Sequence, residues 1–459
     1  MLSANVGIGD EAEAQTVPYI LGIAHPTGFP AYTLAGWLFS HAVPFGTVAW
    51  RLNAFTALCT ALTATGVYLL AVAIAADIAV AVLPAFTFAF GATVWHAALH
   101  ANAQSLSSVC SIFALLGALR FARSADVRAL AFACGCCGLG IATHPSSIWI
   151  IPAILVALAW QTKHLSVRTL AAGAAAFAIP LLLYAYLPLR SAYVAAHGLD
   201  PNAGAPLFGA GGFDWDANSP RTVAGFLNEV LARHEGATGA IQHVFIPRLF
   251  TNEFRWWLDF ATMQYPRWLL LVAVAGTIVL ALRDLRALTV IIAGTAGGAA
   301  FAFTYRQDMH IDRYGIVTFA VLAVLAAASS RFRLPRLPAI AVRSLVASVL
   351  ALAAGLGFVQ NRAAVVAGPV AGGQLVIDAA RQQTPDGAII VAQWDDAAAL
   401  GYGAFVEHAL GSRLIVTAWP AQYGQRYEAW SVTRPVLLEH SFGPDGTSFS
   451  DALPVRRER

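Results

Sequence analysis

Charged residues are scarce in this chain of 459 residues. They make up 12% of the sequence, whereas an ordinary globular domain carries about 25%. Hydrophobic residues make up 58%, and long apolar runs recur, which predicts a polytopic membrane protein. No basic stretch with interleaved aromatic residues is present, which argues against nucleic-acid binding. Lys163 is the only lysine, and this arginine bias, with heavy use of alanine, indicates a bacterial genome rich in G and C.

The hydrophilic segments contain no cysteine, so no disulfide framework is implied. All five cysteines lie in apolar segments: Cys59, Cys110, Cys134, Cys136 and Cys137. The cluster at 134–137 lacks a second ligand pair at the spacing of a zinc site. We interpret these cysteines as small residues at helix interfaces, and we predict no metal-ligating residues.

About ten segments are long enough, or nearly so, to cross a membrane. Several are shorter than the ~20 residues that an upright helix needs, so their boundaries are loose. The segments are 52–76, 78–97, 105–121, 130–142, 148–160, 170–189, 269–282, 287–303, 316–329 and 340–359. The apolar stretch 31–40 is short and bounded by prolines, and we interpret it as re-entrant or interfacial.

Basic residues predict the orientation of these spans. Alternating spans place four arginine- or lysine-bearing connections on one side, at 120–128, 163–168, 283–286 and 331–343. The positive-inside rule makes that side cytoplasmic. The connections 97–104 and 143–147, on the other side, contain neither residue. We therefore expect a protein of the bacterial cytoplasmic membrane whose remaining polar segments face outward.

Three carboxylates, Asp10, Glu11 and Glu13, come first among these outward-facing segments. They precede the loop His25–Pro30, in which prolines and a glycine prevent a regular helix. Such a triplet commonly caps and solvates the start of a helix, where the helix dipole favours negative charge. Because the other polar motifs are expected on the same side, we favour a chemical role and keep the capping role as the alternative.

After Gln360 the composition becomes that of a soluble domain. Helices at 375–382 and 395–410 alternate with strands at 388–392 and 413–418, which predicts a small α/β unit with a crossover connection. It has no glycine-rich phosphate loop, so we assign it no nucleotide. The predicted organisation is a first outer loop over 1–51, a transmembrane domain over 52–360 with an outer loop at 190–268, and a soluble outer domain over 361–459.

The opening motif resembles that of a known membrane family, whose pattern is Gly-Asp-x-x-Glu, Leu-Gly-Ile-Ala-His-Pro-x-Gly-Phe/Tyr-Pro-x-Tyr-x-Leu and Arg-x-Asn. The matching residues are Gly9, Asp10, Glu13, Leu21–His25, Pro26, Gly28, Phe29, Pro30, Tyr32, Leu34, Arg51 and Asn53. Later matches are Gly140–Pro145, Leu187–Ser191, Asp214, Trp215, Pro220–Thr222, Tyr305, Asp308 and Tyr314. The chain is similar to the GT-C glycosyltransferases of a former domain-of-unknown-function family that includes the eukaryotic transmembrane O-mannosyltransferases.

This resemblance implies a mainly α, GT-C-like membrane fold. It also implies the transfer of mannose or another hexose from a polyprenyl-phosphate carrier to a protein or glycan hydroxyl. The transfer would proceed with inversion at the outer face, and an acidic residue of the first outer loop, by position Asp10, would be the catalytic centre. The family has a span before this motif, and only Met1–Ile8 precede it here, so we expect that the first transmembrane helix is missing.

Glycosyl transfer needs a base and a partner for the leaving phosphate. We expect Asp10 to be the base, with Glu11 and Glu13 beside it. Substrate contacts are expected from His25, Arg51, His144, Arg190, Asp214, Trp215, Arg306 and Asp308, with Arg313 as a further candidate. The alternative for Arg51 and Arg190 is snorkelling or head-group binding, and for His25 and His144 it is helix-end hydrogen bonding.

Two other classes of function are weighed against the enzyme. A polytopic transporter would carry charges within its spans, and these have almost none apart from Asp77 near a predicted inner turn. A catalytically inactive assembly partner would keep the fold without the chemistry. The residues require no cofactor, and the use of a divalent cation is left open.

Overall fold

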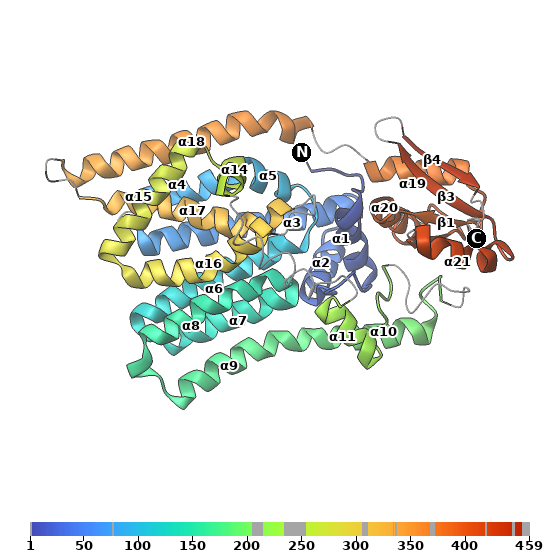
Figure 1. Cartoon of the computed structure of the whole chain (residues 1–459), viewed down its shortest axis with the longest axis horizontal. Helices are drawn as coiled ribbons and strands as arrows, with labels where there is room; N and C mark the ends of the chain where they lie inside the picture. The colour runs from blue at the N-terminus through green and yellow to red at the C-terminus, as the bar shows by residue number, and fades with distance from the viewer. Residues whose placement is uncertain are drawn as a thin grey trace.

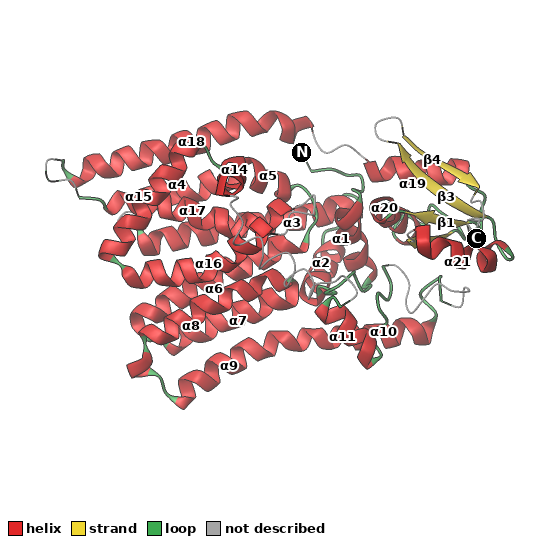
Figure 2. Ribbon diagram, viewed as in Figure 1, coloured by secondary structure: helices red, strands yellow, loops and turns green. Residues whose placement is uncertain are grey.

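Helices make up most of the described part of the molecule, and within that part strands occur only toward the C-terminus (Figure 2). The computed structural model describes residues 2–75, 78–203, 214–233, 254–304, 311–333, 335, 337–367, 372–417, 420–442 and 446–451. Two short helices, α1 (Gly9–Ile20) and α2 (Pro30–Ala42), lie between the long helices and the C-terminal domain (Figure 1). Helix α2 corresponds to the stretch predicted as re-entrant or interfacial, and its 13 residues are too few to cross a bilayer.

The membrane part is a bundle of long apolar helices. Six helices of the described chain are long and apolar enough to cross a membrane, or up to eight if each of two bent pairs is one span. The prediction of a mainly helical membrane protein is therefore confirmed. The elements are α3 (Val48–Ile74), α4 (Ile78–Ala89), α5 (Ala92–Ala98), α6 (Ala103–Ser124), α7 (Val127–Thr143), η1 (Pro145–Ile150), α8 (Ile151–Trp160), η2 (Thr162–His164), α9 (Val167–Leu181), η3 (Leu182–Ala185), α10 (Tyr186–His197), α14 (Phe254–Gln264), α15 (Arg267–Arg283), α16 (Leu285–Thr304), η5 (Ile311–Gly315), α17 (Ile316–Ala328), η6 (Ser329–Arg331) and α18 (Ala339–Ala367).

The ten predicted apolar segments all fall on these helices, but fewer of them qualify as full spans. Helices α7 and α8 are short, and the pairs α4–α5 and α14–α15 bend by 69° and 105°. A bend in an apolar bundle frees backbone groups that need partners. The Gln264 side chain supplies them at the first bend, because it donates to the Phe88 carbonyl at 3.0 Å and accepts from the Val94 N–H at 3.2 Å.

The turns that carry arginine and lysine lie at the end of the bundle away from the C-terminal sheet (Figure 1). Three of them are joined there by charge, since Arg123 and Arg331 both pair with the Asp284 carboxylate. The two guanidinium groups also donate to the carbonyls at the end of α3, on Ala73 and Ile74. Connections that the sequence predicts on one side of the membrane therefore do meet at one end of the bundle.

The C-terminal domain is a four-stranded sheet with helices. Its elements are α19 (Gly372–Gln383), β1 (Ile389–Ala392), α20 (Trp394–Phe405), β2 (Leu414–Thr417), α21 (Pro420–Ser431), β3 (Val436–Phe442) and β4 (Gly446–Asp451). The strand order is β2-β1-β3-β4, with parallel pairing of β1 to β2 and β3 and antiparallel pairing of β3 to β4. Helix α11 (Val223–Leu231) lies in the long connection between α10 and α14.

The sidedness can be tested with two single cysteines placed at opposite ends of the molecule. Ser412 of the sheet domain and Ser124 of the α6–α7 turn are both exposed. We expect a membrane-impermeant maleimide to label Ser412→Cys in intact cells and Ser124→Cys only after permeabilisation, because basic turns stay inside. The parent chain is the control, since four of its five cysteines are buried and Cys136 is half-buried. The reverse labelling pattern would contradict this orientation.

Candidate active site

Helix α1 carries the acidic triplet and begins against the C-terminal domain. Its first residue, Gly9, has a φ of 56°, and a Cβ atom there would lie 2.4 Å from Asp395 Oδ1. Only glycine therefore lets α1 begin so close to α20. Asp10 and Glu11 occupy the first turn, where the helix dipole favours carboxylates. Side chains close together on a helix point in different directions, and the three carboxylates reach three different sets of partners.

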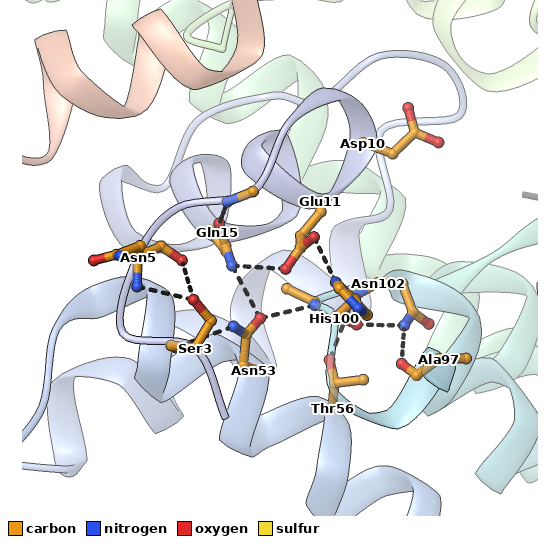
Figure 3. Close-up of polar contacts among 12 residues, drawn as sticks. Ser3, Asn5, Asp10, Glu11, Gln15, Asn53, Thr56, Ala97, His100 and Asn102 are labelled. Atoms are coloured by element: carbon orange, nitrogen blue, oxygen red, sulfur yellow. Dashed lines mark hydrogen bonds and ion pairs between the residues drawn. The ribbon is translucent and has the colours of Figure 1, made fainter. Parts of the chain in front are cut away.

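The Glu11 carboxylate holds together the elements around the start of α1 (Figure 3). Its Oε2 lies 2.7 Å from Nδ1 of His100, and its Oε1 accepts from the Gln15 amide at 3.2 Å. The same Gln15 amide donates to Asn53 Oδ1 at 2.9 Å, which also accepts the N–H of Ala101. These bonds join α1 to α3 and to the α5–α6 turn, so Glu11 has a full set of structural partners.

The Glu13 carboxylate is buried and pairs with His25. One oxygen accepts the backbone N–H of His25 at 2.7 Å, and the other lies 2.5 Å from its Nδ1. Burial by itself lowers the pKa of His25, but the charges of Glu13 and Asp10 and the hydrogen bond to Glu13 together outweigh it and raise that pKa to about 10. His25 is therefore a cation at neutral pH, and the pair fixes the loop before α2 onto α1.

Asp10 points away from the Glu11 network (Figure 3). Its Oδ1 accepts the indole N–H of Trp394, from the start of α20, at 3.1 Å. Its Oδ2 lies 4.0 Å from Nη1 of Arg313, whose side chain is almost fully buried. The Asp10 side chain keeps 35% of its surface exposed, which leaves room for a reactant. Asp10 is thus a partly accessible carboxylate held between residues from two distant parts of the chain.

His144 lies in the break between α7 and η1, close to His25. Its ring stacks on Phe29, with centroids 5.4 Å apart, and lies 5.6 Å from the Tyr314 ring. Its Nδ1 lies 2.8 Å from the Ser146 hydroxyl, and its Nε2 lies 3.3 Å from the Gln104 amide. Burial, together with the positive charge of His25, lowers the pKa of His144 to about 3, so this imidazole stays neutral.

A hydroxyl-rich pocket opens beside these residues, between α6, η1, α16, η5 and α17. It holds about 450 Å³ of empty space, including the part that is open to solvent. Arg313 lines the pocket and also approaches Asp10, so the carboxylate and the pocket adjoin. The lining residues are Gln104, Ser107, Ser108, Ser111, Ser146, Trp149, Ile150, Gly294, Thr295, Gly298, Phe301, Arg313, Tyr314, Val317 and Thr318.

Arg51 and Arg190 are engaged with backbone carbonyls. Arg190 donates to the carbonyls of Ile20 and Leu21, where α1 ends, and the guanidinium lies over the Tyr193 and Trp215 rings. A cation is favourable at that end of a helix dipole. Arg51 donates to the Ser40 carbonyl in the last turn of α2 and to the Phe45 and Gly46 carbonyls in the α2–α3 connection. The structure does not bring either guanidinium to Asp10.

Two buried carboxyl groups, in the long connection between α10 and α14, lie near the Glu13–His25 pair. Burial raises the pKa of Asp214 well above its usual range, and the Glu13 charge adds to the rise. Neither Asp214 oxygen has a hydrogen-bond partner among the described residues. Burial likewise raises the pKa of Glu229 to about 8, although Asn218 donates to it at 2.8 Å. Burial therefore favours the neutral form of both carboxyl groups.

The remaining predicted residues are placed as follows. Trp215 follows Asp214 and packs its ring against Phe405 of the C-terminal domain, with centroids 5.8 Å apart. Arg306 and Asp308 lie outside the described residues. Within the described part of the chain, no group of three or more His, Cys, Asp or Glu side chains could hold a metal ion. No sequence motif includes Trp394, which lies 384 positions from Asp10.

The arrangement of the helices and the C-terminal domain is that of the GT-C fold. Two solved structures of ArnT from Cupriavidus metallidurans, one in the apo state and one bound to undecaprenyl phosphate, each match with a TM-score of 0.50. Each match covers 97% of this chain and 90% of ArnT at 13% sequence identity. At this identity the likeness concerns the fold alone. Fold and site thus define a GT-C-like membrane protein.

The sequence of the N-terminal third is similar to that of proteins named O-mannosyl-transferases. Residues 10–167 match the family model of the protein O-mannosyl-transferase TMEM260 N-terminal domain. The chain is 32% identical over 191 residues to protein O-mannosyl-transferase TMEM260 of Mus musculus, which is 40% of this chain and 27% of the mouse protein. It is 27% identical over 107 residues to the Dictyostelium discoideum protein of that name, which is 23% of this chain and 13% of that protein. The matches therefore span about a quarter or less of these relatives.

The buried carboxyl of Glu229 predicts how stability depends on pH. Its pKa in the folded chain lies above the usual 4.5, so its stabilising contribution is complete below about pH 4.5 and is lost as the pH rises to about 8. Glu229→Gln keeps an acceptor for Asn218 and cannot ionise. We expect the variant to be more stable than the parent above pH 8, on the order of 3 kcal/mol, and similar at pH 4.

The measurement is Tm against pH for the detergent-purified protein. Glu428→Gln, which changes an exposed glutamate of α21, is the matched control and should follow the parent. Coincident curves for Glu229→Gln and the parent would show that Glu229 ionises in the folded protein as it does in water.

Proposed function

We propose that this chain is an integral membrane glycosyltransferase of the GT-C type. It would transfer mannose or another hexose from a polyprenyl-phosphate carrier to a hydroxyl group of a protein or glycan. The observation that carries the proposal is the position of Asp10, an accessible carboxylate linked through Arg313 to a hydroxyl-rich pocket. The resemblance to proteins named O-mannosyl-transferases, and the shared fold of ArnT, whose structure includes undecaprenyl phosphate, support the same class of reaction.

Asp10 has the properties of the base in such a transfer. The acceptor hydroxyl oxygen attacks the anomeric carbon on the face opposite the phosphate, and Asp10 takes the hydroxyl proton. The bond between the anomeric carbon and the phosphate oxygen breaks, and the carrier leaves as polyprenyl phosphate. One displacement of this kind inverts the anomeric configuration. Glu11 and Glu13 do not compete for this role, because their oxygens are taken by His100, Gln15 and His25.

Two cations beside Asp10 are suited to the leaving phosphate. His25 is positive at neutral pH, and Arg313, which lines the pocket, brings its guanidinium within 4.0 Å of Asp10. Positive groups fixed in place before the reaction stabilise the charge that develops on the leaving oxygen. We therefore assign the phosphate to His25 and Arg313 rather than to Arg51 and Arg190, whose guanidinium groups bind carbonyls of the chain.

The pocket has the chemistry of a sugar site. Its serine and threonine hydroxyls and the Gln104 amide offer hydrogen bonds to sugar hydroxyls, and the aromatic rings of Trp149, Phe301 and Tyr314 offer apolar faces. We assign this pocket to the hexose of the donor, with its anomeric carbon toward Asp10. The site lies at the end opposite the basic turns (Figure 1). By the positive-inside rule, catalysis would therefore occur on the outer face of a bacterial cytoplasmic membrane.

Asp10→Asn tests the base directly. The amide keeps the shape of the carboxylate and an acceptor for the Trp394 N–H, but it cannot take a proton. We expect the turnover number to fall by roughly 10²–10⁴-fold while the protein stays folded. The assay follows radiolabelled mannose from a polyprenyl-phosphate mannose donor into a library of serine- and threonine-containing peptides. Glu11→Gln is the comparison and should lose less activity, because Glu11 binds structural partners. Transfer by Asp10→Asn at the parent rate would exclude Asp10 as the base.

Thr318→Val tests the donor pocket. The change is nearly isosteric and removes a hydroxyl from the pocket lining. Loss of one neutral hydrogen bond to the sugar should raise the donor KM by roughly two- to tenfold, with little change in kcat. Thr63→Val is the matched control, since that buried hydroxyl donates only within α3, to the Cys59 carbonyl at 3.0 Å. If the donor KM is the same for the parent, Thr318→Val and Thr63→Val, the assignment of the hexose to this pocket is wrong.

A further inference from the structure

The C-terminal domain packs directly on the first residues of the chain. A single buried apolar cluster contains residues of both parts, namely Val6, Ala12 and Ala49 with Val376, Ile377, Ala397, Leu400 and Tyr402. Within it, the Tyr402 hydroxyl accepts the N–H of Ala49 at 3.0 Å. At the start of α19, a Cβ atom on Gly373 would lie 2.0 Å from the Gly7 carbonyl oxygen, so the two backbones are in contact. Close packing of this kind fixes the position of α20 relative to α1.

Helix α20 lies between α1 and the sheet (Figure 1) and begins next to Asp10. Its first residue, Trp394, makes two contacts with the proposed site. The indole N–H donates to Asp10 Oδ1 at 3.1 Å, and the indole meets the His25 ring edge-on, with centroids 5.4 Å apart. A residue of the C-terminal domain therefore touches both the proposed base and the proposed cation.

We propose that the C-terminal domain completes the active site and that Trp394 is a positioning residue for the Asp10 base. The proposal rests on the proposed function, because it concerns how Asp10 performs its role. The region that matches the TMEM260 family model ends at residue 167, so this contact comes from a part of the chain outside that match. A protein that has the Asp10 motif but no counterpart of residues 372–417 would lack the Trp394 N–H as a donor to Asp10.

The indole N–H has two effects on Asp10. It restricts rotation of the carboxylate by binding Oδ1, which leaves Oδ2 next to Arg313 and the pocket. It also stabilises the ionised form, since a donor to a carboxylate favours the charged state. Removing the N–H should therefore slow the reaction and make Asp10 take up a proton at higher pH. A residue that only held the two domains together would not produce the second effect.

Trp394→Phe in the full chain is the test. Phenylalanine keeps an aromatic ring against His25 and lacks the N–H. We expect kcat to fall by roughly ten- to one-hundred-fold, as for a lost hydrogen bond to a charged group, with the donor KM nearly unchanged. We also expect the acidic limb of the pH–rate profile to move to higher pH. Replacing Trp394 with β-(3-benzothienyl)alanine, which has sulfur in place of the N–H, should give the same result with the bicyclic shape preserved.

Tyr402→Phe is the matched control on the same helix. It removes the acceptor of the Ala49 N–H and so weakens docking, but it leaves Trp394 in place. We expect it to lower stability without moving the acidic limb. If the benzothienyl variant keeps the kcat of the parent and the same acidic limb of the pH–rate profile, Trp394 is not a positioning residue for Asp10. If Trp394 proves to have no role but Asp10→Asn is inactive in the same assay, the proposed function still stands. If Asp10→Asn transfers sugar at the parent rate, both the proposed function and the role of Trp394 are overturned.

Discussion

The buried carboxylate of Glu13 is the constraint on which the structure around α1 and the loop before α2 depends. A carboxylate with 3% exposure is costly unless a cation and hydrogen-bond donors surround it. His25 supplies both, through its ring and its backbone N–H. The pair closes the loop before α2 onto α1 and leaves a positive imidazole beside Asp10. Burial raises the pKa of Asp214, and the negative charge of Glu13 raises it further.

The acidic triplet divides into three roles because a helix points neighbouring side chains in different directions. Glu11 joins three elements through His100 and Gln15, and Glu13 binds the following loop through His25. Asp10 alone points away from these networks, toward Arg313 and the C-terminal domain. Glu11 and Glu13 thus hold other elements of the chain in place, and Asp10 is the member of the triplet for which we propose a chemical role.

Much of the architecture could be predicted because apolar length and composition decide it locally. Every predicted apolar segment is a helix, and the first two strands and the helix between them lie where their residue pattern indicates. The number of full spans was less predictable, since the bends at α4–α5 and α14–α15 need partners such as Gln264 from elsewhere in the chain. Strands β3 and β4 were not predicted, because β3 mixes apolar residues with Glu439, His440 and Ser441 and β4 is mostly polar.

The sequence by itself determined the membrane class, the helices, the C-terminal change to an α/β domain and the motif that contains Asp10 and His25, since these follow from composition and short spacing. Only the tertiary structure decided which charged groups meet. Arg51 and Arg190 have the charge that a phosphate needs, yet backbone carbonyls at nearby helix ends bind them. Trp394 carries no motif, yet packing of α20 on α1 brings its N–H to Asp10. Hydrogen bonds depend on distances of a few ångströms between groups hundreds of residues apart, and packing of the folded chain sets those distances.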